Sequence, residues 1–422
     1  MPSRCIEPAL RPVDADLAAP PSKSWTHRAL VAAALADGVS RIESPLDAGD
    51  TRRTRAGLHA LGIPIEDDAG SWIVRGGGGA LAGGARVACG ESGTTARFLT
   101  ALAAIGAEAS VIDGVPRLRE RPMDELVAAL SALGARVGAG DARLPLTIGG
   151  LGIRGGAVSV SGRRSSQFAS ALLLVAPALP QGLALTVTPP RASFSYALLT
   201  AQVLERFGVA VAREEAGSFR VAPGRVRPAV LRAEGDHSSA SYLFLAAAVT
   251  EGRVRVRGLD PDSLQPDARF TRDLAAAGCS VVTGDGEIDV EGGRGVEAFD
   301  WDLEDAPDLA PTAAVLALFA RGVSRLRGLA NLRAKESDRL AALAANLSRL
   351  GAEVRVEGDA LIVRPAGNPR GGALVDVASD HRIAMAFAVA GLRLPGITLS
   401  DGSVVEKSYP GFWGDFERLR SA

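Results

Sequence analysis

The segments His59-Ala-Leu-Gly-Ile-Pro-Ile65 and Ser131-Ala-Leu-Gly-Ala-Arg-Val137 share one pattern: an apolar residue precedes a glycine, and apolar residues alternate after it. Further copies lie at 205–211, 275–281 and 348–354. Each copy follows an Ala/Leu-rich stretch with helical periodicity and precedes a short run with strand alternation, such as Ser71-Trp-Ile-Val-Arg75. Helices that alternate with short strands predict an α/β protein, and the regular period predicts units of one fold that pack together.

A polar cluster opens another predicted helix at intervals of about 70 residues. The clusters supply Ser, Thr or Asp, which are preferred helix N-caps, and nearly all add Lys, Arg, His or Gln. Capping alone would account for any single cluster. Helix N-termini also carry partial positive charge and free N–H groups, so several of them that converge would bind a substrate with phosphate and carboxylate groups. The clusters occupy 23–28, 91–97, 165–167, 236–239, 308–312 and 380–382.

Lysine is nearly absent, although the chain holds 47 lysine and arginine residues. Only Lys23, Lys335 and Lys407 are lysines. Arginine replaces lysine freely where only a surface charge matters, but not where a compact, rotatable ammonium that can shift its pKa is needed. Each of the three lysines also lies in a polar cluster, so we expect all three to be functional.

Composition bounds the class of protein. At 422 residues the chain is long enough for two domains, and its net charge of -1 argues against a nucleic-acid-binding surface. The cysteines Cys5, Cys89 and Cys279 have neither paired nor metal-type spacing, and with four scattered histidines they predict no zinc site. The N-terminus does not resemble a signal peptide, and no apolar run has the length of a membrane span. We expect a soluble, cytoplasmic protein.

Nine segments, in this order, resemble the motifs of the 5-enolpyruvylshikimate 3-phosphate synthase family. They are SKSWTHRAL (22–30), GESGTTARFL (90–99), RLRERPMDELV (117–127), RSSQFASALLL (164–174), EGDHSSASYLFLAAA (234–248), APDLAPTAAVLA (306–317), NLRAKESDRL (331–340), SDHRIAMAFA (379–388) and VEKSYP (405–410). Any one of these motifs alone would be weak evidence, whereas nine in order over nearly the whole chain are specific.

The resemblance implies a fold of two similar domains, each made of three βαβαββ repeat units in an inside-out α/β barrel, with the active site in the interdomain cleft. The N-terminal enolpyruvyl transferase domain would span 20–234. The C-terminal enolpyruvyl transferase domain would combine 1–19 with 235–422, so that the chain crosses between domains near residues 19 and 234.

The family reaction moves the enolpyruvyl group of phosphoenolpyruvate onto the 5-hydroxyl of shikimate 3-phosphate and releases phosphate, a step of the shikimate pathway to aromatic amino acids. The resemblance implies no metal and no organic cofactor. The implied partners are these two small molecules, without nucleic acid or membrane, and we expect a monomer.

The family motifs also imply a role for individual residues of this chain. The phosphoenolpyruvate site would comprise Lys23, Gly93, Arg121, Gln167, Arg339, His381, Arg382 and Lys407. The shikimate 3-phosphate site would comprise Lys23, Ser24, Arg28, Ser165, Ser166, Gln167, Ser193, Tyr196, Asp308, Asn331 and Lys335. The catalytic residues would be Asp308 as base for the 5-hydroxyl, Glu336 as proton carrier at the methylene, Lys23 and Lys407. The lysines are alternative proton carriers, and His381 would orient its neighbours.

This chain departs from the usual family pattern at three positions. Pro21 replaces a glycine before Ser-Lys-Ser, Glu91 replaces an asparagine near Gly93, and Phe98 replaces a proline after Arg97. None of these changes removes a catalytic group, but together they leave the affinity for phosphoenolpyruvate open.

Three other functions fit the sequence less well. A related transferase that acts on UDP-N-acetylglucosamine carries a reactive cysteine in the loop that reads 114–121 here, and this loop has none. An RNA-end-processing protein of related fold would need an adenylated histidine or a basic face. A non-catalytic binding protein would not need a complete set of catalytic residue types.

Overall fold

The computed structural model describes residues 3–138, 142–150, 152–214, 217–367 and 369–421. The chain divides into two compact units, here called the N-unit (21–233) and the C-unit (1–20 together with 234–422). Each unit combines helices with mixed β-sheets, so the α/β class predicted from the sequence is confirmed. None of the described helices combines the length and apolar character needed to span a bilayer.

The described strands of the N-unit form three sheets. In spatial order these are β13 (Val230–Arg232), β3 (Val39–Glu43), β5 (Ser71–Arg75) and β4 (Ile65–Asp68); β6 (Arg86–Ala88), β7 (Ala109–Asp113) and β8 (Leu146–Gly149); and β11 (Ala212–Arg213), β12 (Ser218–Val221), β10 (Leu183–Thr188) and β9 (Gly156–Ser161). Each sheet contains one parallel pair, β13 with β3, β6 with β7 or β9 with β10. The other pairs are antiparallel.

The described strands of the C-unit repeat this arrangement. Its sheets are β15 (Ser280–Gly284), β16 (Glu287–Glu291), β14 (Arg253–Arg257) and β2 (Asp14–Ala18); β17 (Asp300–Asp302), β18 (Ser324–Arg327), β20 (Ala360–Arg364) and β19 (Glu353–Glu357); and β1 (Arg4–Cys5), β22 (Thr398–Leu399) and β21 (Leu374–Val375). Strand β2 pairs in parallel with β14, and β1 pairs antiparallel with β22. The first residues of the chain therefore complete two sheets of the C-unit.

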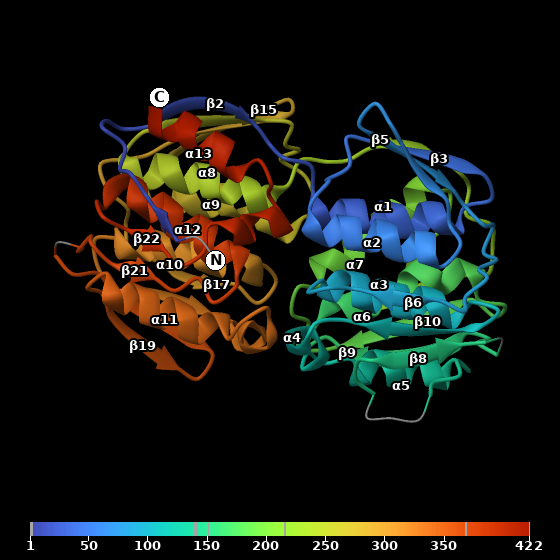
Figure 1. Ribbon diagram of the computed structural model, residues 1–422. Helices are drawn as coiled ribbons and strands as arrows, with labels where there is room; N and C mark the ends of the chain where they lie inside the picture. Colours follow the sequence, from blue (N-terminus) through green and yellow to red (C-terminus); the bar gives the residue numbers. More distant parts are fainter. Residues whose placement is uncertain (1–2, 139–141, 151, 215–216, 368, 422) are drawn as a thin grey trace. The chain divides into compact units, whose positions relative to one another are not determined.

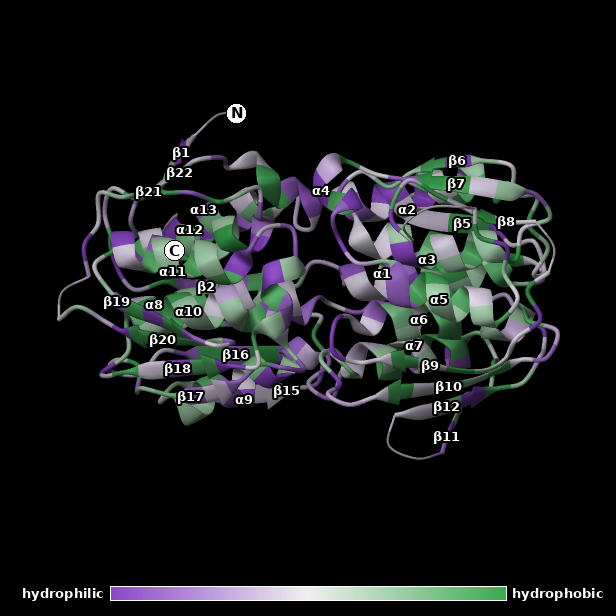
Figure 2. Cartoon of the chain, turned by 90° about the horizontal axis from the view of Figure 1, so that it is seen from below, coloured by the Kyte–Doolittle hydropathy of each residue, from purple (hydrophilic) through white to green (hydrophobic). Residues whose placement is uncertain are grey.

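Three helices in each unit are buried along nearly their whole length. In the N-unit they are α1 (Lys23–Leu35), α3 (Gly93–Ala104) and α6 (Ser166–Val175), and in the C-unit α8 (His237–Thr250), α10 (Ala310–Leu318) and α12 (His381–Arg393). Within each unit these helices pack against one another. A helix that is apolar all round is typical of a protein interior, and Figure 2 shows hydrophobic colouring along the helices and strands of each unit. We call these six the inner helices.

The other long helices bury only one side. They are α2 (Gly49–Ala60), α5 (Asp124–Ala132), α7 (Ser195–Arg206), α9 (Arg269–Ala276), α11 (Arg339–Arg349) and α13 (Phe412–Ser421). In Figure 1, α2 lies beside α1, and these two helices contact each other. Short helical turns connect the longer elements: α4 (Pro116–Arg119), η1 (Ala176–Ala178), η2 (Pro266–Ala268), η3 (Pro307–Leu309), η4 (Ala330–Ala334) and η5 (Ser403–Lys407).

The glycine of the repeated sequence pattern ends five of these one-sided helices. At the end of α2, Gly62 has φ +93°, its N–H donates to the carbonyl of His59, and the N–H of Ile63 donates to the carbonyl of Leu58. These two hydrogen bonds define a Schellman motif, which needs a left-handed residue that only glycine adopts without strain. The equivalent glycines after α5, α7, α9 and α11 have φ between +75° and +99° and make the same bonds. The pattern therefore marks where a helix stops and its strand begins.

A close approach at Gly391 ties the N-terminal segment to α12. A Cβ added at Gly391 would lie 2.4 Å from Cγ2 of Ile6. Ile6 is buried, and its backbone N–H donates to the carbonyl of Ile397. We therefore expect Gly391→Ala to lower the free energy of unfolding by about 1–3 kcal/mol, the usual cost of overpacking. Gly414 in α13 is the matched control, since a Cβ there meets nothing within 4 Å.

Chemical denaturation of both variants tests this contact. Gly414→Ala should be neutral or stabilising by up to about 1 kcal/mol, because alanine is the better helix former. If Gly391→Ala were as stable as Gly414→Ala, the N-terminal segment would not pack on α12 as described.

Candidate active site

The first turns of the inner helices carry seven of the predicted site residues: Lys23, Ser24, Gly93, Ser166, Gln167, His381 and Arg382. Five of these helices are capped by a polar side chain that lies in, or directly before, a predicted polar cluster. Ser22, Ser92, Ser165, Asp236 and Asp380 each accept a hydrogen bond from a backbone N–H of the first turn. The sixth helix, α10, begins directly after η3 without a side-chain cap. Asp308 lies within η3, so its carboxylate is not used for capping.

Lys23 lies at the first position of α1 and meets a carboxylate. Its Nζ is 3.3 Å from Oδ2 of Asp50, in the first turn of α2. Both side chains are largely buried, with exposed fractions of 14% and 7%. Sequence reasoning missed Asp50, since its only signal is an acidic residue at the start of a predicted helix. This ion pair holds the ammonium of Lys23 at the N-terminal end of α1.

Gly93 begins α3 with two guanidinium groups close to it. A Cβ at this position would lie 2.8 Å from Nη1 of Arg121 and 2.9 Å from Nη1 of Arg97. Arg97 also donates to Oε1 of Gln167, at 2.5 Å, and Nε2 of Gln167 donates to Thr94 at 3.0 Å. The absence of a side chain at Gly93 therefore lets two buried arginines approach the start of α3. Arg97 belongs to the family motif at 90–99, but it was not predicted as a site residue.

Arg28 occupies the interior of the N-unit between α1, α6 and α7. Its guanidinium donates to the hydroxyls of Thr200 and Ser170 and to the carbonyls of Ser24 and Tyr196, at 2.8–3.1 Å. Its Cζ lies 5.4 Å from the ring centroids of Phe98 and Tyr196. Burial lowers the pKa of Arg28 to about 10. In this structure Arg28 links three helices, and its role as a ligand of shikimate 3-phosphate stays a prediction.

The departures from the family pattern have different consequences. Phe98 is buried in α3, where its ring faces the Arg28 guanidinium. Glu91 is exposed, just before the capping residue of α3. Phe98 therefore contributes to packing around a predicted site residue, whereas the Glu91 carboxylate faces solvent.

The remaining predicted residues of the N-unit lie at the starts of α6 and α7. Ser165 caps α6, and Ser166 begins it with an exposed fraction of 6%. Ser193 is buried just before α7 with φ +59°, a conformation that non-glycine residues rarely adopt, and Tyr196 lies in the first turn of that helix. Helices α6 and α7 pack against each other, so these side chains belong to one region of the N-unit.

In the C-unit, three cations surround the carboxylate of Asp308. Its Oδ1 is 3.0 Å from Nη1 of Arg339 and 3.5 Å from Nζ of Lys335. Its Oδ2 accepts a hydrogen bond from Nη2 of Arg382 at 2.9 Å. The residues predicted from three separate motifs, beginning at 306, 331 and 379, thus meet at one carboxylate.

Arg339 connects Asp308 with two further carboxylates. Its guanidinium donates to Asp380 at 2.8 Å and to Glu336 at 3.2 Å. Burial alone would lower the pKa of Arg339, but Asp380, Glu336 and Asp308 outweigh it and raise the pKa further above its usual value. A buried arginine paired with three carboxylates remains charged. Asp380 was expected to open α12, and its ion pair with Arg339 could not be inferred from the sequence.

Glu336 also faces the third lysine. Nζ of Lys407, in η5, lies 3.5 Å from Oε1 of Glu336, and both side chains are mostly buried. All three lysines of the chain therefore lie beside a carboxylate of the candidate site: Asp50, Asp308 or Glu336.

Asn331 and His381 complete the predicted set. Oδ1 of Asn331, in η4, is buried and accepts no hydrogen bond from any residue of the described ranges. His381 is 1% exposed, and its Nδ1 lies 4.0 Å from Oδ1 of Asp380. His381 is thus buried beside the capping carboxylate of α12, and its orienting role stays a prediction.

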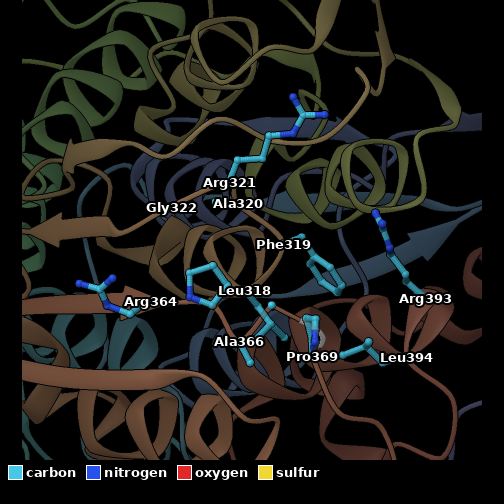
Figure 3. A pocket seen from close by; sticks show the side chains of 12 residues that line it. Leu318, Phe319, Ala320, Arg321, Gly322, Arg364, Ala366, Pro369, Arg393 and Leu394 are labelled. Atoms are coloured by element: carbon cyan, nitrogen blue, oxygen red, sulfur yellow. The ribbon is translucent and has the colours of Figure 1, made fainter.

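A separate hollow of about 640 Å³ lies elsewhere in the C-unit, bordered by Arg321, Arg364 and Arg393 (Figure 3). Each of these arginines already pairs with a glutamate at 3.5–3.6 Å: Glu297, Glu353 or Glu251. Figure 3 shows their guanidinium groups well apart around apolar side chains such as Phe319. None of the predicted site residues lines the hollow, and its three arginines do not point toward one common position.

Comparison with known proteins adds independent evidence. Residues 9–416 match the family model described as EPSP synthase (3-phosphoshikimate 1-carboxyvinyltransferase). A 3-phosphoshikimate 1-carboxyvinyltransferase of Methanoculleus marisnigri is 46% identical over 407 residues, which cover 95% of this chain and 96% of the relative. One of Syntrophobacter fumaroxidans is 43% identical over 424 residues, covering 99% of this chain and 100% of the relative. An EPSP synthase structure from Acinetobacter baumannii, 26% identical, has a TM-score of 0.81 and covers 98% of this chain and 97% of that one.

Fold, polar clusters and relatives together define an enzyme of the transferase class. More narrowly, the chain belongs to the EPSP synthase (3-phosphoshikimate 1-carboxyvinyltransferase) family. The resemblance inferred from the nine motifs is therefore confirmed, while the roles of individual residues stay predictions.

The lysine–carboxylate pairs lead to a test of why these lysines persist. We expect Lys23→Arg, Lys335→Arg and Lys407→Arg each to lower the rate of carboxyvinyl transfer on the order of 100-fold, the usual cost of losing one preorganised charge contact in a transition state. A planar guanidinium cannot reproduce the position of a compact ammonium beside its carboxylate. Steady-state kinetics and thermal unfolding should show a large loss of rate with little loss of stability.

An exposed pair serves as the control for these variants. Arg327 lies 2.6 Å from Asp300 on the surface of the C-unit, and Arg327→Lys should leave the rate unchanged. Near-normal turnover in all three lysine variants would show that the lysines are accidental survivors of an arginine-rich composition.

Proposed function

We propose that this chain transfers the enolpyruvyl group of phosphoenolpyruvate to the 5-hydroxyl of shikimate 3-phosphate, with release of phosphate. Membership of the EPSP synthase family supports this proposal. The structural observation that carries it is the position of Asp308, whose carboxylate lies within 3.5 Å of Lys335, Arg339 and Arg382. The carboxylate can take the proton of a substrate hydroxyl, although the cations lower its basicity, and the same cations can bind the anionic groups of two substrates.

The proposed chemistry proceeds by addition and elimination. The 5-hydroxyl oxygen adds to C2 of phosphoenolpyruvate and loses its proton, while the C3 methylene gains one, which forms a tetrahedral adduct. Loss of phosphate from C2 and of a proton from the new methyl group then restores the carbon–carbon double bond. We assign Asp308 as the base for the hydroxyl and Glu336 as the proton carrier at C3.

The ion pairs of the site support these assignments. Lys407 lies 3.5 Å from Glu336, so a proton carrier and an ammonium that can share its task are neighbours. Lys335 stands in the same relation to Asp308. Lys23, beside Asp50, supplies a positive charge at the start of α1. Positive charge fixed before the reaction stabilises the anionic character that develops at the carboxylate and phosphate of the adduct.

Arginines would hold the anionic groups of the substrates. A guanidinium has five N–H donors, so Arg339 and Arg382 can bind phosphoenolpyruvate and still retain Asp308 and Asp380. Arg121, Gly93, Gln167 and His381 would complete that site. Shikimate 3-phosphate would be bound by the starts of α1, α6 and α7 together with Asp308, Asn331 and Lys335, with the hydroxyls of Ser165 and Ser166 directed to its phosphate.

We further propose that the two units are the enolpyruvyl transferase domains, 20–234 and 1–19 with 235–422, each an inside-out α/β barrel with the substrates in a cleft between them. The buried inner helices and the sheets with one exposed face support helices inside and strands outside. We propose a monomer that acts in the cytoplasm without a cofactor.

The rival transferase, which acts on UDP-N-acetylglucosamine, is not favoured. Its reaction depends on a reactive cysteine, whereas residues 116–119 form the short helix α4 in a loop without one. Cys89 is fully buried, and burial raises the pKa of its thiol to about 12, so the thiolate is scarce at neutral pH.

A phosphate-release assay tests the proposed function. Wild-type protein should release phosphate from phosphoenolpyruvate only when shikimate 3-phosphate is present. A chelator should leave the rate unchanged, because lysines and arginines supply the positive charge at the site. Asp308→Asn, which cannot accept the hydroxyl proton, should lower kcat by roughly 100-fold to 10,000-fold. Turnover of UDP-N-acetylglucosamine instead, or a strict requirement for a divalent ion, would contradict the proposal.

A further inference from the structure

Asp267 is a buried carboxyl group for which the proposed reaction has no use. It lies in η2, between β14 and α9, and is 2% exposed. Its Oδ2 accepts a short hydrogen bond from the hydroxyl of Ser238. Its Oδ1 is buried and accepts no hydrogen bond from any residue in the described part of the chain. An unsatisfied buried polar atom is costly, so a native protein that keeps one usually has a use for it.

The first turns of the inner helices of the C-unit bring Asp267 close to the candidate base. Ser238, its hydrogen-bond partner, lies in the first turn of α8. At the start of the next turn, Ser241 bonds to the carbonyl of Ser238 and to the hydroxyl of Thr312, which lies in α10 shortly after Asp308. Both η2 and η3 contact α8. The segments that carry Asp267 and Asp308 therefore both lie against α8.

Arg382 is the cation that both carboxyl groups share. Its Nη2 donates to Asp308, and its Nη1 lies 3.4 Å from the hydroxyl of Tyr242 on α8. The guanidinium also attracts Asp267 electrostatically, while the Asp308 carboxylate repels it. The other charged group that faces Asp267 is Asp236, the capping residue of α8.

The protonation state of Asp267 changes near neutral pH. Burial, and next the charge of Asp308, raise the pKa of Asp267 to about 7, although Arg382 and the Ser238 hydroxyl act to lower it. His237, on the same turn of α8, is mostly buried, and burial lowers its pKa, so it is neutral at this pH. Its Nε2 bonds to the carbonyl of Asp260. Asp267 is therefore the group of this cluster whose charge varies over the physiological range.

Asp308 needs such a neighbour because three cations stabilise its charged form. Lys335, Arg339 and Arg382 make its carboxylate a poor proton acceptor. A second carboxylate that repels the charged form of Asp308 and competes for Arg382 makes Asp308 a better proton acceptor. The repulsion between two carboxyl groups is mutual, so a group that Asp308 makes harder to ionise also makes Asp308 easier to protonate.

We propose that Asp267 is a positioning residue, which strengthens Asp308 as a base and orients Arg382 without touching either substrate. This inference rests on the proposed function. Because the effect passes through charge, it predicts a change in the pH dependence of the reaction, which a merely structural residue would not alter.

The decisive variant is Asp267→Asn, since the amide oxygen can still accept the Ser238 hydroxyl bond. The pH profile of kcat/KM reports the base of the free enzyme. Asp267 repels Asp308 only when it is ionised, that is, above about pH 7. The wild-type profile should therefore rise as the pH passes through 7. This rise should be missing from Asp267→Asn, whose kcat at pH 8 should fall on the order of tenfold because the base is weaker. An equal rise near pH 7 in wild type and Asp267→Asn would overturn the proposal.

Asp273→Asn is the matched control. Asp273, in α9, is also buried, and it pairs with Arg269 at 2.7 Å rather than with a site residue. Its loss should lower stability but leave the pH profile of kcat/KM unchanged. Loss of the rise near pH 7 in both variants would mean that any damage near η2 produces the effect, and this would also overturn the proposal.

A second readout needs no activity. Because the pKa of Asp267 is raised on folding from 3.8 to about 7, the unfolded chain loses this proton first, and the residue destabilises the fold progressively as pH rises through this window. The free energy of unfolding of wild type should therefore fall relative to Asp267→Asn between about pH 4 and 7. If the free energies of unfolding of wild type and Asp267→Asn changed in parallel with pH, the proposal would be overturned even if the enzyme is active.

These two readouts separate the possible failures. The stability curves of wild type and Asp267→Asn could diverge while their pH profiles of kcat/KM coincide. That result would leave the proposed function standing and remove only the role of Asp267. A wild type that never releases phosphate from the two substrates would remove both.

Discussion

A buried helix must satisfy the N–H groups of its first turn, and the rest of this structure depends on how the chain meets that need. The inner helices are apolar along their length, so polar groups that complete their first turns collect at their starts. Ser22, Ser92, Ser165, Asp236 and Asp380 supply the caps, and the neighbouring residues supply lysines, arginines and a glutamine. Each unit thereby gains a polar region at one end of its apolar interior, with helix N-termini directed into it.

The cost of burying charge explains the composition of that region in the C-unit. Arg339 is 1% exposed, and a charge so deeply buried persists only with partners, which here are Asp308, Glu336 and Asp380. The same pairs place two carboxylates suited to proton transfer beside cations suited to phosphate and carboxylate groups. Ion pairing that keeps the site intact without substrate therefore also prepares it for chemistry. Each of the three lysines also lies beside a carboxylate, and this is why we expect arginine to be a poor substitute at these positions.

Local features of the fold were predictable from the sequence, whereas pairings across the chain were not. Gly62 and its equivalents could be read as helix ends because a left-handed residue requires glycine, and Ser165 or Asp236 as helix starts because caps have few chemical solutions. Three features depend instead on how distant elements pack. They are the ion pair of Lys23 with Asp50, the four hydrogen bonds that Arg28 donates, and the electrostatic interaction of Asp267 with Asp308. Periodicity does not encode such contacts, and the family motifs identified Lys23 and Asp308 as site residues but not Asp50 or Asp267.

The central claim is that the starts of the inner helices, rather than any other polar surface, bind the anionic substrates. A crystal structure of the protein with shikimate 3-phosphate tests this claim most directly. The account predicts electron density for the phosphate at the start of α6, within hydrogen-bond distance of the hydroxyls of Ser165 or Ser166. A phosphate found only elsewhere, for example in the hollow bordered by Arg321, Arg364 and Arg393, with these helix starts empty, would contradict it.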